Sequence, residues 1–66
     1  MTPLHFHADN GRVFVTSGAR SAYVTQDQAD QYAVLFFTHR LVRQANELTD
    51  AMVAAGYVPW GRRAAA

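Results

Sequence analysis

Two histidines near the start of the chain are the first candidates for chemistry. His5 and His7 lie two residues apart, a spacing that puts both imidazoles on one face of a strand. Imidazole is a common zinc ligand, but a zinc site needs three or four protein ligands. Asp9 is the only donor nearby, since His39 falls in a distant predicted helix. We therefore predict no metal site and no cofactor.

Nucleophilic and acid-base catalysis find little support in the remaining polar residues. Ser21 is predicted near His5 and Ser17 lies beside a turn, but no third orienting group or oxyanion loop accompanies them. Asp27 and Asp30 are better explained by the start of a helix, where carboxylates favour the positive end of the dipole. The chain has no glycine-rich phosphate loop, zinc signature or dinucleotide fingerprint. We therefore predict that the protein is not an enzyme.

Turn residues organise the first part of the chain into a three-stranded antiparallel meander. Asn10-Gly11 suits a type I′ hairpin, whose two central residues both need positive φ, and Gly18-Ala19 suits a type II′ hairpin. These turns predict strands over about residues 4–8, 12–17 and 20–25.

The predicted register separates the strand residues onto two faces, because alternate side chains point to opposite sides of a sheet. One face is apolar throughout and collects Leu4, Phe6, Ala8, Val13, Val15, Ala22 and Val24. The opposite face collects His5, His7, Arg12, Phe14, Thr16, Ser21 and Tyr23, and we expect Arg20 beside it at the second turn.

A helix is predicted directly after the meander. Thr25 and Gln28 have the spacing of a capping box, and no further Gly or Pro occurs until Gly56. The simplest interpretation is one long α-helix over about residues 26–55, followed by a tail over 57–66. The fold class is then α+β, a βββα arrangement in a single domain over residues 1–66, with the helix packed on the apolar face.

The predicted helix is longer than the sheet that must cover it. A helix of about thirty residues spans about 45 Å, whereas strands of about five residues span roughly 17 Å. The tail Tyr57–Trp60, a helix break near Asn46, or a second copy of the chain would each cover the remainder. We favour a homodimer, whose predicted interface is the helical stripe of Phe37, Leu41, Ala45, Leu48 and Met52.

Size and composition indicate a small globular domain. The chain has 66 residues, 50% hydrophobic and 17% charged, with no cysteine to reinforce the fold. The net charge is +1, with all basic residues being arginine, and does not by itself indicate a nucleic-acid or membrane partner. Neither a signal peptide nor a membrane span is evident, so we expect a cytoplasmic protein. Ala64–Ala66 are left out of the functional interpretation.

The polar face of the meander is the predicted partner-binding surface. His7, Phe14 and Tyr23 should lie side by side across the strands, and aromatic residues and arginine are enriched at protein interfaces. Coverage of this row by Trp60 and the tail is the alternative. The predicted site residues are His5, His7, Arg12, Phe14, Arg20 and Tyr23.

In its size and its lack of catalytic groups, the chain resembles the small inhibitors encoded by bacterial viruses, anti-CRISPR proteins among them. This likeness rests on general character and on no residue motif. The high apolar content, the uncovered helix stripe and the aromatic row support the same prediction, a small, dimeric, non-enzymatic module that occupies the surface of a partner protein.

DNA binding is the alternative prediction. A three-stranded meander followed by a helix is similar to the arm-binding domains of tyrosine integrases, which lay the sheet into the major groove. The basic residues available for phosphate contacts are Arg12 and Arg20, with Arg62 and Arg63 in the tail. This count is small for a surface whose affinity depends on several phosphate contacts.

Overall fold

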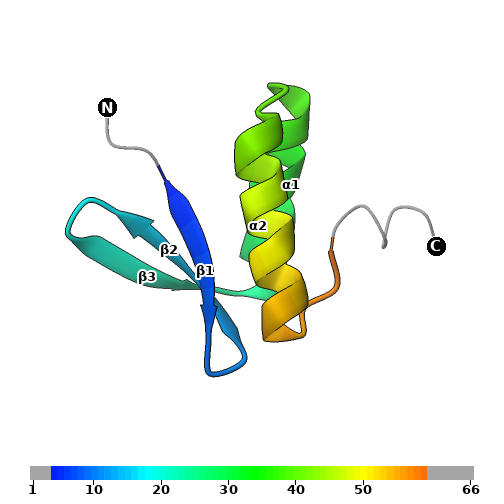
Figure 1. Ribbon diagram of the computed structural model, residues 1–66. Coiled ribbons are helices and arrows are strands. Elements are labelled where there is room, and N and C mark those ends of the chain that lie inside the picture. The colour runs from blue at the N-terminus through cyan, green and yellow to red at the C-terminus, as the bar shows by residue number, and fades with distance from the viewer. Residues whose placement is uncertain (1–3, 60–66) are drawn as a thin grey trace.

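Three strands are followed by two helices in the computed structural model, which describes residues 4–59. The strands are β1 (His5–Asp9), β2 (Arg12–Ser17) and β3 (Arg20–Val24), and the helices are α1 (Gln26–Thr38) and α2 (Val42–Ala55). The strands form one antiparallel sheet in the order β1-β2-β3. Both helices lie on the same side of this sheet, so the domain has two layers (Figure 1). The α+β class is confirmed, whereas the single long helix is wrong.

The two predicted turns determine the register of the sheet. Asn10 and Gly11 both have positive φ, 53° and 75°, as a type I′ hairpin requires. Gly18 has a φ of 61°, which suits the first central position of a type II′ hairpin. Phe6 lies opposite Val15, as predicted, so the apolar face is continuous across the sheet.

The predicted capping box starts α1. The Thr25 hydroxyl accepts a hydrogen bond from the Gln28 backbone N–H at 3.2 Å. The Gln28 side-chain oxygen in turn accepts one from the Thr25 backbone N–H at 3.0 Å. Two of the backbone donors at the start of the helix are thereby satisfied.

The end of α1 corrects the prediction of a single helix. Leu41 N–H donates to the Phe36 carbonyl at 2.8 Å, and Arg40 N–H donates to the Phe37 carbonyl at 3.2 Å. This pair of bonds is the Schellman motif, whose central residue adopts a left-handed conformation. Arg40 takes that position with a φ of 57°. The chain therefore reverses direction at residues 39–41, earlier than the alternative break near Asn46.

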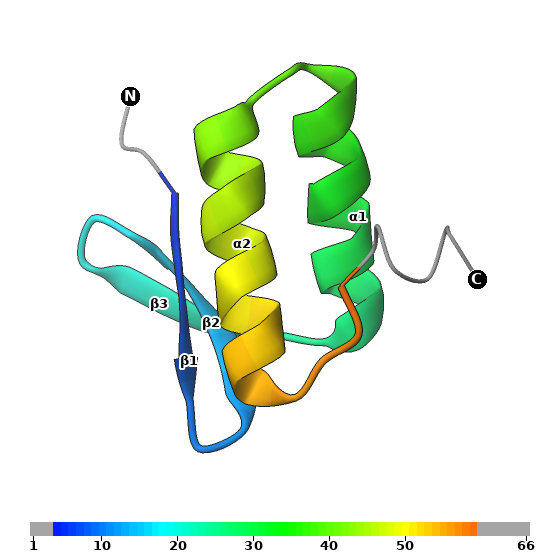
Figure 2. The same cartoon turned by 45° about the vertical axis from the view of Figure 1, so that its right-hand side comes forward.

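The same motif closes α2 at a glycine. Tyr57 N–H donates to the Met52 carbonyl at 2.7 Å, and Gly56 N–H donates to the Val53 carbonyl at 3.1 Å, with Gly56 at a φ of 84°. The two helices run antiparallel and lie side by side (Figure 2).

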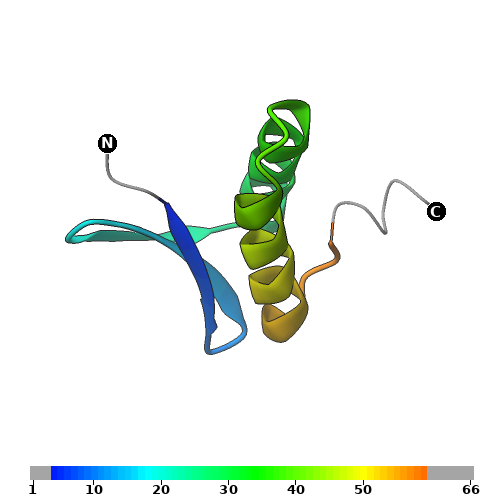
Figure 3. The ribbon, with the colours of Figure 1, turned by 45° about the horizontal axis from the view of Figure 1, so that its top comes forward.

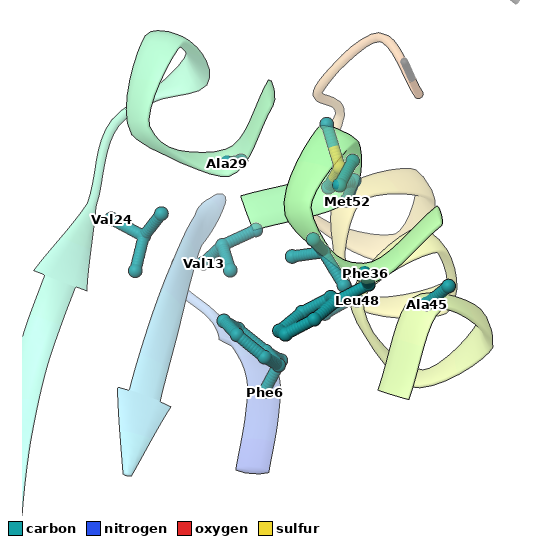
Figure 4. Close-up of a cluster of buried hydrophobic side chains, with 10 residues drawn as sticks. Phe6, Val13, Val24, Ala29, Phe36, Ala45, Leu48 and Met52 are labelled. Carbon is teal, nitrogen blue, oxygen red and sulfur yellow. The ribbon is translucent and has the colours of Figure 1, made fainter. Parts of the chain in front are cut away.

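One hydrophobic core joins the sheet to both helices (Figure 4). The ring of Phe6 makes edge contacts with Tyr32 and Phe36, with centroids 5.4 and 5.7 Å apart. The largest fully buried side chains are Leu48, Met52, Val13 and Val24.

The predicted dimer stripe is largely part of this core, which is a correction. Ala45, Leu48 and Met52 are at most 2% exposed within one chain, because the break after α1 folds α2 back onto the sheet and onto α1. They therefore offer no surface to a second copy. Phe37 and Leu41 remain 52% and 42% exposed.

The residues after α2 close one end of the domain. The Tyr57 hydroxyl donates to the Val24 carbonyl at 2.7 Å and accepts from the Val13 N–H at 3.4 Å. The Gln26 side chain bonds both the N–H and the carbonyl of Val58, at 3.0 and 2.9 Å. Burial raises the pKa of Tyr57, and the nearby Tyr23 hydroxyl raises this pKa further. The predicted cover by Trp60 falls outside the described residues.

Candidate protein-interaction surface

The predicted aromatic row is present on the outer face of the sheet, the face opposite the helices. The strand register puts Phe14 opposite both His7 and Tyr23. The rings of His7 and Phe14 stack, with centroids 5.8 Å apart and planes 15° apart. Phe14 meets Tyr23 edge to face at 6.2 Å. Cross-strand pairs of this kind also stabilise the sheet, by roughly 0.2 to 1 kcal/mol each.

Arg12 extends the row at its β3 side. Its guanidinium carbon lies 5.2 Å from the centroid of the Tyr23 ring, a cation-π contact. The contact orients a side chain that would otherwise sample many rotamers. We define Arg12 and the row of His7, Phe14 and Tyr23 as the outer-face cluster.

The outer-face cluster is accessible to a partner. Both helices lie on the other side of the sheet, as the turned view shows (Figure 3). His7 is exposed, Phe14 is half-buried, and Tyr23 keeps 47% of its surface exposed. Phe14 lies at the centre of the surface, on the middle strand.

Two predicted site residues lie apart from this cluster. Arg20 pairs with Ser17 and therefore shares the face of Val13 and Val15, which is the helix side of the sheet. Arg20 was predicted beside the outer face, and this is wrong. The two residues that flank a two-residue turn lie on the same face of the sheet, and Ser17 is on the helix side. His5 is on the edge strand, and its Nδ1 lies 3.3 Å from Glu47 Oε1 of α2. This pair is exposed and contributes little to stability.

Metal ligands do not converge in the part of the chain that the structure describes. Within residues 4–59, no group of three or more His, Cys, Asp or Glu side chains could hold a metal ion. None of the helices in this part is long and apolar enough to cross a membrane.

A groove on the helix side of the sheet was not predicted. It runs between β3 and α1 in two overlapping parts with volumes of about 410 and 540 Å³. Val15 and Ala22 line both parts together with Tyr32, whereas Leu35 lines the inner part and Arg20 the outer part. The groove lies on this side because α2 packs mainly on β1 and not on β3. The alternation of residues along β3 places Arg20 on this side of the sheet, but it does not indicate that this part of the face is left open.

Comparison of the chain with protein-family models, with curated proteins and with solved structures found no match. The functional interpretation therefore depends on the chemistry of these two surfaces.

Proposed function

We propose that this protein is a small, non-enzymatic binding module that occupies the surface of a partner protein with the outer face of its sheet. The observation that carries this proposal is the outer-face cluster, an exposed aromatic row with an arginine fixed over one end. Tyrosine and arginine are among the residues that contribute most to protein-protein binding energy.

The cluster is organised before any partner binds. Phe14 and Tyr23 are set by strand pairing, and Arg12 is oriented by the Tyr23 ring. Side chains that are already ordered lose less conformational entropy on binding, typically about 0.5–1.5 kcal/mol for each flexible side chain. The cluster carries a cation, so the partner surface that fits it is apolar with an acidic rim.

The action that suits this surface is occlusion of a partner's own site. The chain is small, and the outer face of its sheet presents apolar and cationic groups together. DNA binding is the weaker candidate, because within residues 4–59 Arg12 is the only arginine that the register places on the outer face. Several phosphate contacts are needed for useful affinity at physiological salt.

Site-specific photo-crosslinking tests the proposal. In one variant of the full chain, expressed in its source cells, the photo-crosslinking amino acid benzoylphenylalanine replaces Phe14. In the matched control variant it replaces Asn46, an exposed residue of α2. We expect a protein adduct from position 14 that Arg12→Ala weakens, and no such adduct from position 46. Absence of an adduct at position 14, or equal adducts at both positions, would contradict the proposal.

Fluorescence anisotropy with a mixed-sequence DNA duplex of about 30 base pairs tests the alternative. We expect no binding at micromolar protein in low salt. Binding that weakens with salt and is lost in Arg12→Ala would instead favour DNA as the target.

A further inference from the structure

Strand β3 has a free edge. A two-residue turn makes Ser17 and Arg20 a hydrogen-bonded pair, so the backbone groups of Arg20, Ala22 and Val24 face β2. By the same alternation, the N–H and carbonyl groups of Ser21 and Tyr23 point away from β2. Edge strands are usually protected by proline, lysine, bulges or a covering segment. The sequence of β3 contains neither proline nor lysine, and the side chains of residues 20–23 are all exposed.

An apolar surface borders this free edge on the helix side. Ala22 is exposed at the groove, and Leu35 of α1 is 47% exposed beside it. A strand placed next to β3 would therefore find apolar contacts on its helix side and hydrogen-bonding groups along its length.

The charges near the two ends of β3 have opposite signs, so two copies of this strand have complementary charges when they pair antiparallel. The strand begins with Arg20, which has no carboxylate partner among the described residues, and runs into Asp27 in the first turn of α1. When two such strands pair antiparallel, the cationic start of each lies near the acidic end of the other. A parallel arrangement would bring like charges together, so the antiparallel one is favoured.

We propose that a second copy of this chain docks its β3 antiparallel against β3, which joins two three-stranded sheets into one six-stranded sheet. Ser21 of each copy then lies opposite Tyr23 of the other, and each such pair exchanges its backbone hydrogen bonds. The contact is isologous, with Ala22 at the two-fold axis. Both α1 helices lie on the same side of the joined sheet, and the Leu35 side chains fill the space above the axis.

This dimer differs from the predicted helix-stripe dimer and goes beyond the proposed binding function. It uses an exposed strand edge and leaves the core residues of α2 in place. Its outer face presents two copies of the outer-face cluster on one continuous sheet, which would bind a symmetric or repeated target more tightly than one copy does.

Light scattering coupled to size exclusion, over a roughly hundredfold range of concentration, tests the assembly without any partner. We expect the full chain to be a dimer and Ser21→Pro to be a monomer. Proline at position 21 removes an N–H that faces the free edge and leaves the pairing with β2 intact. Ala8→Pro is the matched control, because Ala8 occupies the equivalent outward-facing position of the other edge strand, β1. It should remain a dimer, and circular dichroism should show both variants folded.

Charge reversal keeps the proposal testable even if a proline variant does not fold. Arg20→Asp and Asp27→Arg should each raise the dimer dissociation constant at least about tenfold, and the double variant should restore it. Leu35→Asp should also give a monomer with the helical content of the parent. A monomer at every concentration would overturn the proposal, as would a dimer that neither Ser21→Pro nor single charge reversal weakens.

Discussion

The hydroxyl of Tyr57 offers the sharpest test of how the domain is closed. Tyr57→Phe keeps the ring and removes one oxygen, which donates to Val24 at 2.7 Å and accepts from Val13 at 3.4 Å. The substitution leaves a backbone carbonyl and a backbone N–H at the end of the β2–β3 pair without this partner. Val13 and Val24 lie opposite each other in the sheet, so each group keeps its strand partner and loses only the contact with Tyr57.

The expected loss is about 1 kcal/mol. A hydrogen bond contributes about 0.5–1.5 kcal/mol net, and the strand register still pairs Val13 with Val24, so neither backbone group is left without a partner. The 3.4 Å bond is long and adds little, so the shorter bond to Val24 dominates. For a domain of this size, each kcal/mol lowers the melting temperature by about 4–8 °C, so the expected decrease is also about 4–8 °C.

Thermal and urea unfolding, followed by circular dichroism, measure this change. Tyr32→Phe is the matched control, because the ring of Tyr32 packs on Phe6 and its hydroxyl forms no hydrogen bond within the described residues. The control should change the free energy of unfolding by less than about 0.5 kcal/mol. If Tyr57→Phe is as stable as the control, the hydroxyl does not close the sheet and the reasoning is refuted.

Three further predictions concern pH, backbone and core. The pKa of Tyr57 is raised in the folded state above the unfolded value near 10, so its contribution to the free energy of unfolding is fully present below pH 10 and is lost as the pH rises through the folded pKa. In urea unfolding at alkaline pH, Tyr57→Phe should therefore lose less stability than the parent. Arg40→Gly should raise the free energy of unfolding by about 0.5–1 kcal/mol, because it removes the strain of an arginine with positive φ, whereas Gly56→Ala should lower it by about 1 kcal/mol or more. Equal effects of the two variants in calorimetry would contradict the left-handed conformation assigned to both helix ends. Leu48→Ala should lower the free energy of unfolding in urea by about 2–5 kcal/mol, because Leu48 is 1% exposed within one chain. Since the side chain is buried within the monomer, this loss should not depend on protein concentration.

The sheet could be predicted from the sequence because its turns are specified locally. Asn10-Gly11 and Gly18-Ala19 each permit one hairpin type, and a hairpin type sets the register of both strands. The row of His7, Phe14 and Tyr23 follows from that register by alternation alone. Its geometry was therefore predictable, whereas its partner is not encoded in any local pattern.

The break between the helices could not be predicted, because its usual signals are missing. Helix ends of this type normally carry glycine at the left-handed position, and Arg40 takes it here. The next helix normally begins with a polar cap, but Leu41 is at that position and makes no side-chain capping bond. The tertiary packing of α2 on the sheet outweighs these local costs. The groove beside β3 was missed for the same reason, since it depends on where α2 packs.

The one-sided placement of the helices divides the sheet into zones of unequal local stability. Near Val13 and Val24 the strands pack in the core and Val24 bonds Tyr57. The backbone amides of this part of the sheet should therefore exchange with deuterium only when the whole domain unfolds. Toward Ser17 and Arg20 the β2–β3 hairpin projects beyond the helices, and its amides should exchange through local fraying (Figure 3). The projecting end of this hairpin therefore has more conformational entropy to lose on binding than the end held by Tyr57.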